Sequence, residues 1–114
     1  MSNILGSAFI EISTNIHNGE PYLIKERKLW YDDISELHFV ITFSINKSYE
    51  VQRTLLISGL KYKSCNFYNT RTIFTIYIRC INDIDRLIRS FGVSTGISIV
   101  VHGRDKIERF FDGK

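Results

Sequence analysis

Apolar and polar residues alternate along much of the chain, and this alternation predicts strands joined by tight turns. The clearest example covers residues 37–57, with Asn46-Lys47-Ser48 in the middle. When Ile45 is paired with Tyr49, nine of the ten side chains on one face are apolar, and Arg53 is the exception. A period of two is typical of a sheet with one buried and one solvated face. The pattern therefore predicts a β-hairpin over this segment.

Another hairpin is predicted within residues 9–26, where Asn18-Gly19 separates two strand-like runs. Asn-Gly suits a type I′ turn because both of its central positions need a positive φ. Pro21 would begin the second strand, and proline has no backbone N–H to donate. That strand is therefore expected at an edge of the sheet.

A third hairpin is predicted to turn at Asn69-Thr70, with arms over residues 60–68 and 71–79. In this register Cys65 faces Phe74, and one face of the hairpin is buried. The opposite face is rich in tyrosine and arginine. Its members are Tyr62, Tyr68, Arg71, Ile73, Thr75, Tyr77 and Arg79.

One amphipathic helix is predicted at about residues 83–91. Its apolar side chains recur at i, i+3, i+4 and i+7, which is the spacing of one helix face. They are Ile84, Leu87, Ile88 and Phe91. Asn82 can cap the N-terminus, and Gly92 suits the position after the last turn. Because so short a helix needs tertiary packing, its apolar stripe is expected to lie on the sheet.

The end of the chain has two competing interpretations. Gly96–Val101 is predicted to be a buried strand, followed by the polar stretch His102-Gly103-Arg104-Asp105. We favour a turn there that leads into a final strand, since turn residues usually serve the turn. The alternative is a short helix over residues 105–111, with Asp105 as N-cap and its apolar residues on one face. A helix of about six residues carries a high nucleation cost, which favours the strand.

Together these elements predict an α+β fold. We expect a mostly antiparallel, meander-like sheet of six to eight strands built from hairpins, with the helix of residues 83–91 on one face. Trp30-Tyr31 falls in a stretch without clear periodicity, and Asp33 followed by Glu36 resembles a capping box, so a short helical turn is expected there. No linker interrupts residues 1–114, so a single domain is expected.

The location of the protein is inferred from two negative signals. No apolar run reaches the roughly 18 residues that span a bilayer. The N-terminus has no basic segment followed by a long apolar one, so it does not resemble a secretory signal. We therefore expect a cytoplasmic protein without a membrane partner.

The net charge of +3 is small but uneven. Residues 47–81 carry six basic side chains against one acidic side chain, Glu50. The basic ones are Lys47, Arg53, Lys61, Lys63, Arg71 and Arg79. A local excess of this kind attracts nucleic acid or an acidic protein surface. The many isoleucines and the single alanine, Ala8, correspond to A+T-rich codons, which are common in bacterial mobile elements.

No catalytic or metal-binding motif stands out. The three histidines and two cysteines lack the HxxxH and CxxC spacings that bring metal ligands together. Neither the nucleophile motif GxSxG nor the phosphate-binding motif GxxxxGK[ST] is present. Cys65 and Cys80 are interpreted as small hydrophobic residues without a disulfide. We expect no enzyme activity, no metal and no cofactor, and a role for His102 only at the rim of an interface.

The sequence therefore predicts a small binding protein. Tyrosine, tryptophan and arginine are enriched where proteins bind one another, and local acids add charge for recognition. The expected contact residues are Tyr62, Tyr68, Arg71, Tyr77, Arg79, Trp30, Tyr31, Asp32 and Asp33. We expect an immunity or inhibitor protein that covers the active surface of a cognate toxin domain. The alternative is a nucleic-acid-binding accessory protein of phage or plasmid origin, because aromatic and basic side chains also bind single strands.

Overall fold

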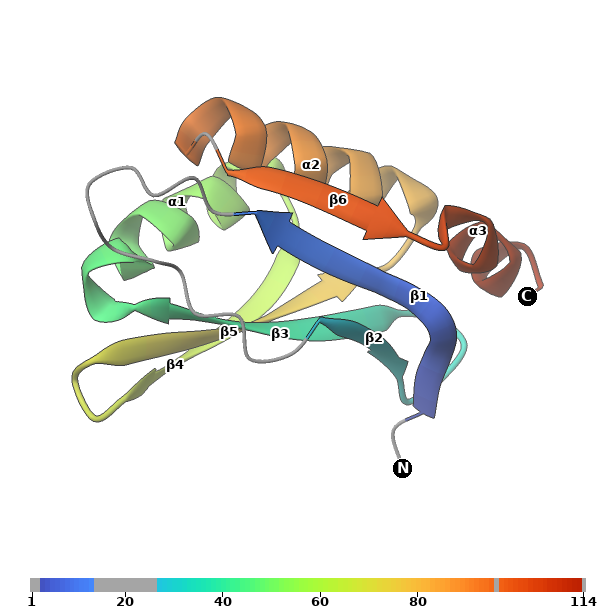
Figure 1. Ribbon diagram of the computed structural model, residues 1–114, viewed down its shortest axis with the longest axis horizontal. Helices are drawn as coiled ribbons and strands as arrows, with labels where there is room; N and C mark the ends of the chain where they lie inside the picture. Colours follow the sequence, from blue (N-terminus) through green and yellow to red (C-terminus); the bar gives the residue numbers. More distant parts are fainter. Residues whose placement is uncertain (1–2, 14–26, 96, 114) are drawn as a thin grey trace.

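The fold is a six-stranded antiparallel sheet with three α-helices in the described part of the chain (Figure 1). The computed structural model describes residues 3–13, 27–95 and 97–113. The strands are β1 (Asn3–Ser13), β2 (Lys28–Tyr31), β3 (Leu37–Ser44), β4 (Lys61–Phe67), β5 (Arg71–Ile78) and β6 (Ser98–His102). The helices are α1 (Ser48–Ser58), α2 (Ile81–Thr95) and α3 (Arg104–Asp112), and a 3₁₀ turn, η1 (Ile45–Lys47), precedes α1. The predicted α+β class is confirmed.

The strand order is β4-β5-β3-β2-β1-β6, so the sheet joins segments that are distant in sequence. β3 pairs with β5 over eight residues, and β1 pairs with β6 over five. β1 bends near Gly6, which has a φ of 51°, and its register with β2 shifts between Ile4 and Phe9. Figure 1 shows the resulting curvature of β1, which brings β6 in front of α2.

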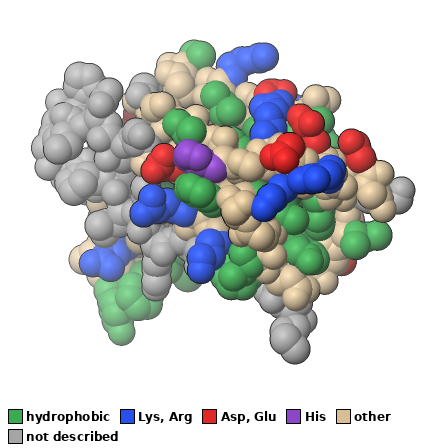
Figure 2. Space-filling view, turned by 45° about the vertical axis from the view of Figure 1, so that its right-hand side comes forward, with side chains coloured by type: hydrophobic (Ala, Val, Ile, Leu, Met, Phe, Trp, Pro, Cys, Tyr) green, Lys and Arg blue, Asp and Glu red, His purple; other side chains and the backbone are tan. Residues whose placement is uncertain are grey.

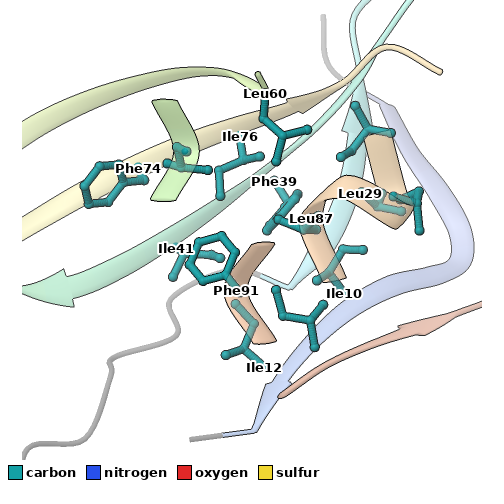
Figure 3. Packing of buried hydrophobic residues seen from close by; sticks show 14 of the residues in the cluster. Ile10, Ile12, Leu29, Phe39, Ile41, Leu60, Phe74, Ile76, Leu87 and Phe91 are labelled. Atoms are coloured by element: carbon teal, nitrogen blue, oxygen red, sulfur yellow. The ribbon is translucent and has the colours of Figure 1, made fainter. Parts of the chain in front are cut away.

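The core lies between the concave face of this sheet and the helices (Figure 3). We call this the inner face of the sheet and the opposite one the outer face. Ile10, Phe39 and Phe74 come from three different strands of the inner face, and each is fully buried. Leu87 and Phe91 of α2 meet them from the helix side, as Figure 3 shows. Burial of these side chains supplies the main driving force for the fold.

The helix predicted at residues 83–91 is confirmed and is longer than expected. α2 packs along α1 and beside β6, with Ile84, Leu87 and Phe91 buried. Gly92 lies inside the helix, so it does not end it. The chain turns after Thr95, whose hydroxyl donates to the Phe91 carbonyl and accepts from the Ile97 N–H. The strand predicted at residues 96–101 is observed as β6, but it is not buried as expected: it forms an edge of the sheet, and Ser98 and Val100 are exposed.

The hairpin predicted over residues 37–57 is wrong in its second half. β3 has the predicted buried face, with Phe39 and Ile41 in the core, but residues 48–58 form α1. β3 instead pairs with β5, which is a more distant segment. In the helix, Val51 and Leu55 are four residues apart and share the buried side. The alternating pattern of residues 49–57 thus contained a helical spacing as well.

The hairpin over residues 60–79 is confirmed, with a register that differs by one residue. Cys65 faces Ile73, where the prediction placed it opposite Phe74. The turn falls one residue earlier than expected: Tyr68 and Asn69 both have positive φ, and the Thr70 N–H donates to the Phe67 carbonyl. A shift of one residue exchanges the two faces of a strand. The side chains of β4 therefore point the opposite way from the prediction.

The final strand predicted after His102 is wrong, because the chain forms α3 there. Gly103 has a φ of 72°, and its carbonyl accepts from the N–H groups of Lys106 and Ile107. Ile107 is fully buried, and the ring of Phe110 lies 5.2 Å from that of Tyr31. Tertiary packing of this apolar side offsets the nucleation cost that favoured a strand.

Two remaining predictions concern the N-terminal half. The turn at Asn18-Gly19 and the strand after it fall outside the described residues. Trp30 and Tyr31 lie in β2, so they are part of the sheet and not of an irregular stretch. A bend without helix follows, in which the Asp33 carboxylate accepts from the Ser35 N–H at 2.7 Å.

Candidate binding surface on the outer sheet face

Four neighbouring strands each contribute one side chain to a row across the outer face. Lys61 of β4 pairs with Tyr77 of β5, Tyr77 pairs with His38 of β3, and His38 pairs with Trp30 of β2. Partners in register lie on the same face of a sheet. We call Lys61, Tyr77, His38 and Trp30 the cross-strand row. Its three ring side chains are half-buried and its lysine is exposed.

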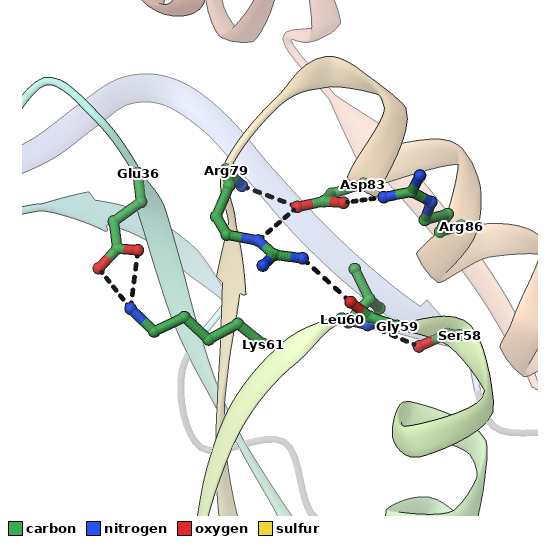
Figure 4. A network of polar contacts seen from close by, with 8 residues as sticks. All are labelled: Glu36, Ser58, Gly59, Leu60, Lys61, Arg79, Asp83 and Arg86. Carbon is green, nitrogen blue, oxygen red and sulfur yellow. Dashed lines mark hydrogen bonds and ion pairs between the residues drawn. The ribbon is translucent and has the colours of Figure 1, made fainter.

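Contacts within the cross-strand row hold its side chains in place. The Lys61 Nζ atom lies 4.5 Å from the centroid of the Tyr77 ring, and the Lys63 Nζ atom lies 5.8 Å from it. The rings of His38 and Tyr77 are 5.9 Å apart and tilted by 44°. Lys61 also donates to the carboxylate of Glu36 at 3.0 Å (Figure 4). Side chains that are already ordered lose less entropy when a partner binds.

The predicted contact residues do not all belong to this surface. Trp30 and Tyr77 lie in the cross-strand row. Tyr62 pairs with Ile76 and lies on the inner face, where its ring is 6.3 Å from that of Phe74. Tyr31 also points to the inner side, against α3. The aromatic side chains of the prediction are therefore divided between two faces.

Tyr68 and Arg71 lie at the tip of the β4–β5 hairpin. Tyr68 is 82% exposed, and its ring contacts that of Phe67 at 4.2 Å. Arg71 is six residues before Tyr77 along β5, a distance of about 20 Å at the rise of an extended strand. The tip is thus a separate part of the outer surface and is remote from the cross-strand row.

Arg79 has a structural role, because it makes hydrogen bonds within the protein (Figure 4). Its backbone N–H and its Nε both donate to the Asp83 carboxylate, at 3.0 and 3.3 Å. Its Nη2 donates to the carbonyl of Gly59 at 3.0 Å. Asp83 is fully buried and also accepts from Arg86. Arg79 therefore links the end of α1 to the start of α2, a role that the sequence did not suggest.

The two acidic residues of the prediction lie in the bend between β2 and β3. Both Asp32 and Asp33 are exposed, and Asp33 organises the bend through Ser35. The neighbouring Glu36 binds Lys61 of the cross-strand row. The acidic bend and the cross-strand row are therefore connected through one ion pair.

His102 lies on the outer face of the other half of the sheet. Its ring stacks on Phe9 at 4.2 Å, and its Nε2 atom is 3.1 Å from the Glu11 carboxylate. Glu11 also lies 3.5 Å from the Arg27 guanidinium. Figure 2 shows basic and acidic side chains close together on this side of the molecule, with a histidine among them. Opposite charges here neutralise one another, so this region is less suited than the cross-strand row to attract a charged partner.

His38 and the two lysines of β4 complete a surface that the sequence identified only in part. His38 was not among the expected contact residues, and in the structure it is half-buried on β3. Its neighbour Tyr77 is 39 residues later, and no local pattern reveals a pairing of that range. Lys61 and Lys63 were recognised only as members of a basic segment, because the predicted register differs by one residue from the one that pairs Lys61 with Tyr77.

Neither a metal site nor a membrane-spanning helix is evident in the part of the chain that the structure describes. It contains no group of three or more histidine, cysteine, aspartate or glutamate side chains positioned to hold a metal ion. Cys65 and Cys80 are free and exposed. Among the described helices, none has the length and apolar character needed to cross a membrane. Comparisons of the chain with protein-family models, curated proteins and solved structures gave no match.

Proposed function

We propose that this protein is a non-enzymatic binding protein that recognises an acidic protein surface with the outer face of its sheet. The observation that carries the proposal is the cross-strand row, in which Trp30, His38 and Tyr77 lie in register beside Lys61. None of the described helices packs on this face, since α1 and α2 lie on the inner side. Half-buried tryptophan and tyrosine rings on a rigid sheet are typical of binding hot spots.

The charge of the surface defines the partner. Lys61, Lys63 and Lys28 lie on the outer face of their strands, and Glu36 pairs with the first of them. A basic surface accelerates association with an acidic one and disfavours basic partners. The partner is therefore expected to present carboxylates around an apolar patch that receives the rings.

We place this binding activity in a toxin–immunity pair of the bacterial cytoplasm. A small protein with a rigid binding face and no catalytic motif can neutralise a toxin by covering its active surface. The A+T-rich residue usage, typical of mobile elements, supports this assignment. Inhibitors of nucleases are usually acidic, so a basic immunity protein requires a toxin with an acidic patch.

The test is co-purification with the product of the adjacent gene, together with rescue of cells that express this product. We expect a tight 1:1 complex and full rescue by the wild-type protein. Trp30→Ala and Tyr77→Ala should each weaken the complex by about thirtyfold, the effect of losing a 2 kcal/mol hot spot. Tyr49→Ala is the matched control, because Tyr49 is 78% exposed on α1, away from the sheet face. If neither complex nor rescue is found, the proposal fails.

Single-stranded nucleic acid is the second candidate ligand. The cross-strand row combines rings with lysines, as stacking surfaces for bases do. However, the Lys61 ammonium already occupies one side of the Tyr77 ring, and Tyr62 points inward. Binding of a labelled oligonucleotide at low salt, lost steeply as salt rises, would favour this candidate over the protein partner.

A further inference from the structure

The strand β4 forms one edge of the sheet, and we propose that the acidic partner adds an extended strand to it. This inference rests on the proposed function, since it specifies how the partner of the cross-strand row is held. An edge strand has backbone N–H and C=O groups that point away from the sheet and can pair with another chain. The partner strand would then lie beside the lysines of the outer face.

The edge at β4 is regular and accessible. All seven residues of β4 pair consecutively with β5, without a register shift. Every side chain of β4 is exposed except Tyr62, which is half-buried. The other edge of the sheet, β6, is shorter, with five residues, and α2 packs beside it. A long, uninterrupted edge offers more main-chain hydrogen bonds to an added strand than a short one.

The positive charge of β4 favours an added strand that carries acidic residues. Lys61 and Lys63 are two positions apart, so both project on the outer face, and β4 contains no acidic residue. Directly opposite side chains of neighbouring strands come within about 4.5–5.5 Å at their Cβ atoms. A partner strand with carboxylates at two alternate positions would pair with both lysines. The occupant is therefore an extended acidic segment.

The same lysines disfavour a different occupant, namely a second copy of this chain. Lysine on edge strands is a common means of preventing edge-to-edge association. A second β4 would bring two more lysines to the junction without adding a carboxylate. The Lys61 ammonium also has only one acidic neighbour in the described structure, Glu36, and this pair is partly solvent-exposed. An acidic strand can share or replace that contact at small cost.

The test uses a capped heptapeptide in which glutamate alternates with threonine, titrated into the full-length protein. Amide hydrogen exchange should slow by about tenfold or more at every second residue of β4, those whose N–H groups point away from β5. A peptide with lysine in place of glutamate should not bind. The double variant Lys61→Glu/Lys63→Glu should weaken binding of the acidic peptide by at least about tenfold. Arg89→Glu on α2 is the matched charge control and should leave the affinity unchanged.

Three other outcomes would overturn the inference that an acidic strand is added to β4. Binding of the acidic peptide without alternate protection of β4 would indicate docking through side chains only. Equal binding of the lysine peptide would remove the charge argument. A concentration-dependent dimer with β4 protected in the absence of peptide would identify a second copy as the occupant. In all of these cases the complex with the adjacent gene product and its sensitivity to Trp30→Ala remain a separate test of the proposed function.

Discussion

Replacing Asp83 with asparagine should destabilise the fold far more than the same change at Asp85, two residues later on α2. The Asp83 side chain has no exposed area, and it accepts hydrogen bonds from the Arg79 N–H, the Arg79 Nε and Arg86. Asparagine has the same shape but no charge, and its amide group would present a donor to one of these donors. The variant would therefore lose part of the hydrogen bonding that the Asp83 carboxylate provides at the start of α2.

The expected magnitude follows from the individual contacts. A hydrogen bond that a backbone N–H donates to a buried carboxylate contributes about 1.5–3 kcal/mol. The side chains of Arg79 and Arg86 are 44% and 52% exposed, so each ion pair adds only about 0.3–0.5 kcal/mol. Asp83→Asn should therefore lower the free energy of unfolding by about 2–4 kcal/mol, and the Tm by about 8–15 °C in a chain of this size.

Asp85→Asn provides the matched control. Asp85 pairs with Arg104 of α3, and both side chains are nearly half exposed, so its loss should cost less than about 1 kcal/mol. Urea unfolding followed by circular dichroism measures both variants. A loss of less than about 1 kcal/mol for Asp83→Asn, or equal losses for the two variants, would refute the structural role of this network.

Three further predictions use single substitutions and the same unfolding assay. Gly103→Ala should lower the free energy of unfolding by about 2–4 kcal/mol, because φ is 72° and a Cβ would lie 2.8 Å from the backbone of β1. Gly59→Ala is the control and should lower it by about 1 kcal/mol, because φ is 75° but no atom lies within 4 Å of the added Cβ. Tyr68→Gly should raise the free energy of unfolding by about 0.5 kcal/mol. The left-handed backbone conformation of Tyr68 is unfavourable for tyrosine, and relieving it should outweigh the loss of the ring contact with Phe67; a lower stability would contradict this. His102→Ala should leave the fold intact and cost about 0.5–1.5 kcal/mol, since it removes one stacking contact and one partly exposed pair with Glu11. Unfolding of this variant would contradict the expectation that the fold does not depend on His102.

The sequence predicted those parts of the fold that depend on local patterns. The helix at residues 83–91 and the two faces of β3 follow from residue spacing alone, and both are observed. The segment 49–57 was misassigned because Val51 and Leu55 satisfy the spacing of a strand and of a helix at once. β3 was predicted to pair with residues 49–57, whereas its partner in the structure is β5. No local pattern reveals a partner so distant in sequence.

The candidate site was predictable to a similar extent. Trp30 and Tyr77 were identified from residue type, and they lie in the cross-strand row. Tyr62 and Arg79 were assigned to the same surface, but a one-residue register shift places the first on the inner face, and a buried carboxylate binds the second. Strand register and buried polar contacts depend on the three-dimensional arrangement, so residue type alone could not show which side chains lie on the outer face.

The pairing of β1 with β6 has a consequence for synthesis of the protein on the ribosome. Glu11 and His102 are in contact although 91 residues separate them along the chain. β1 is translated before the other described strands, whereas its neighbour on this side, β6, is translated after all of them. Until then, the apolar side chains of β1, including Ile10 and Ile12, have an incomplete core. The nascent chain is therefore expected to complete its sheet late, and to depend on rapid closure of this pair to avoid aggregation.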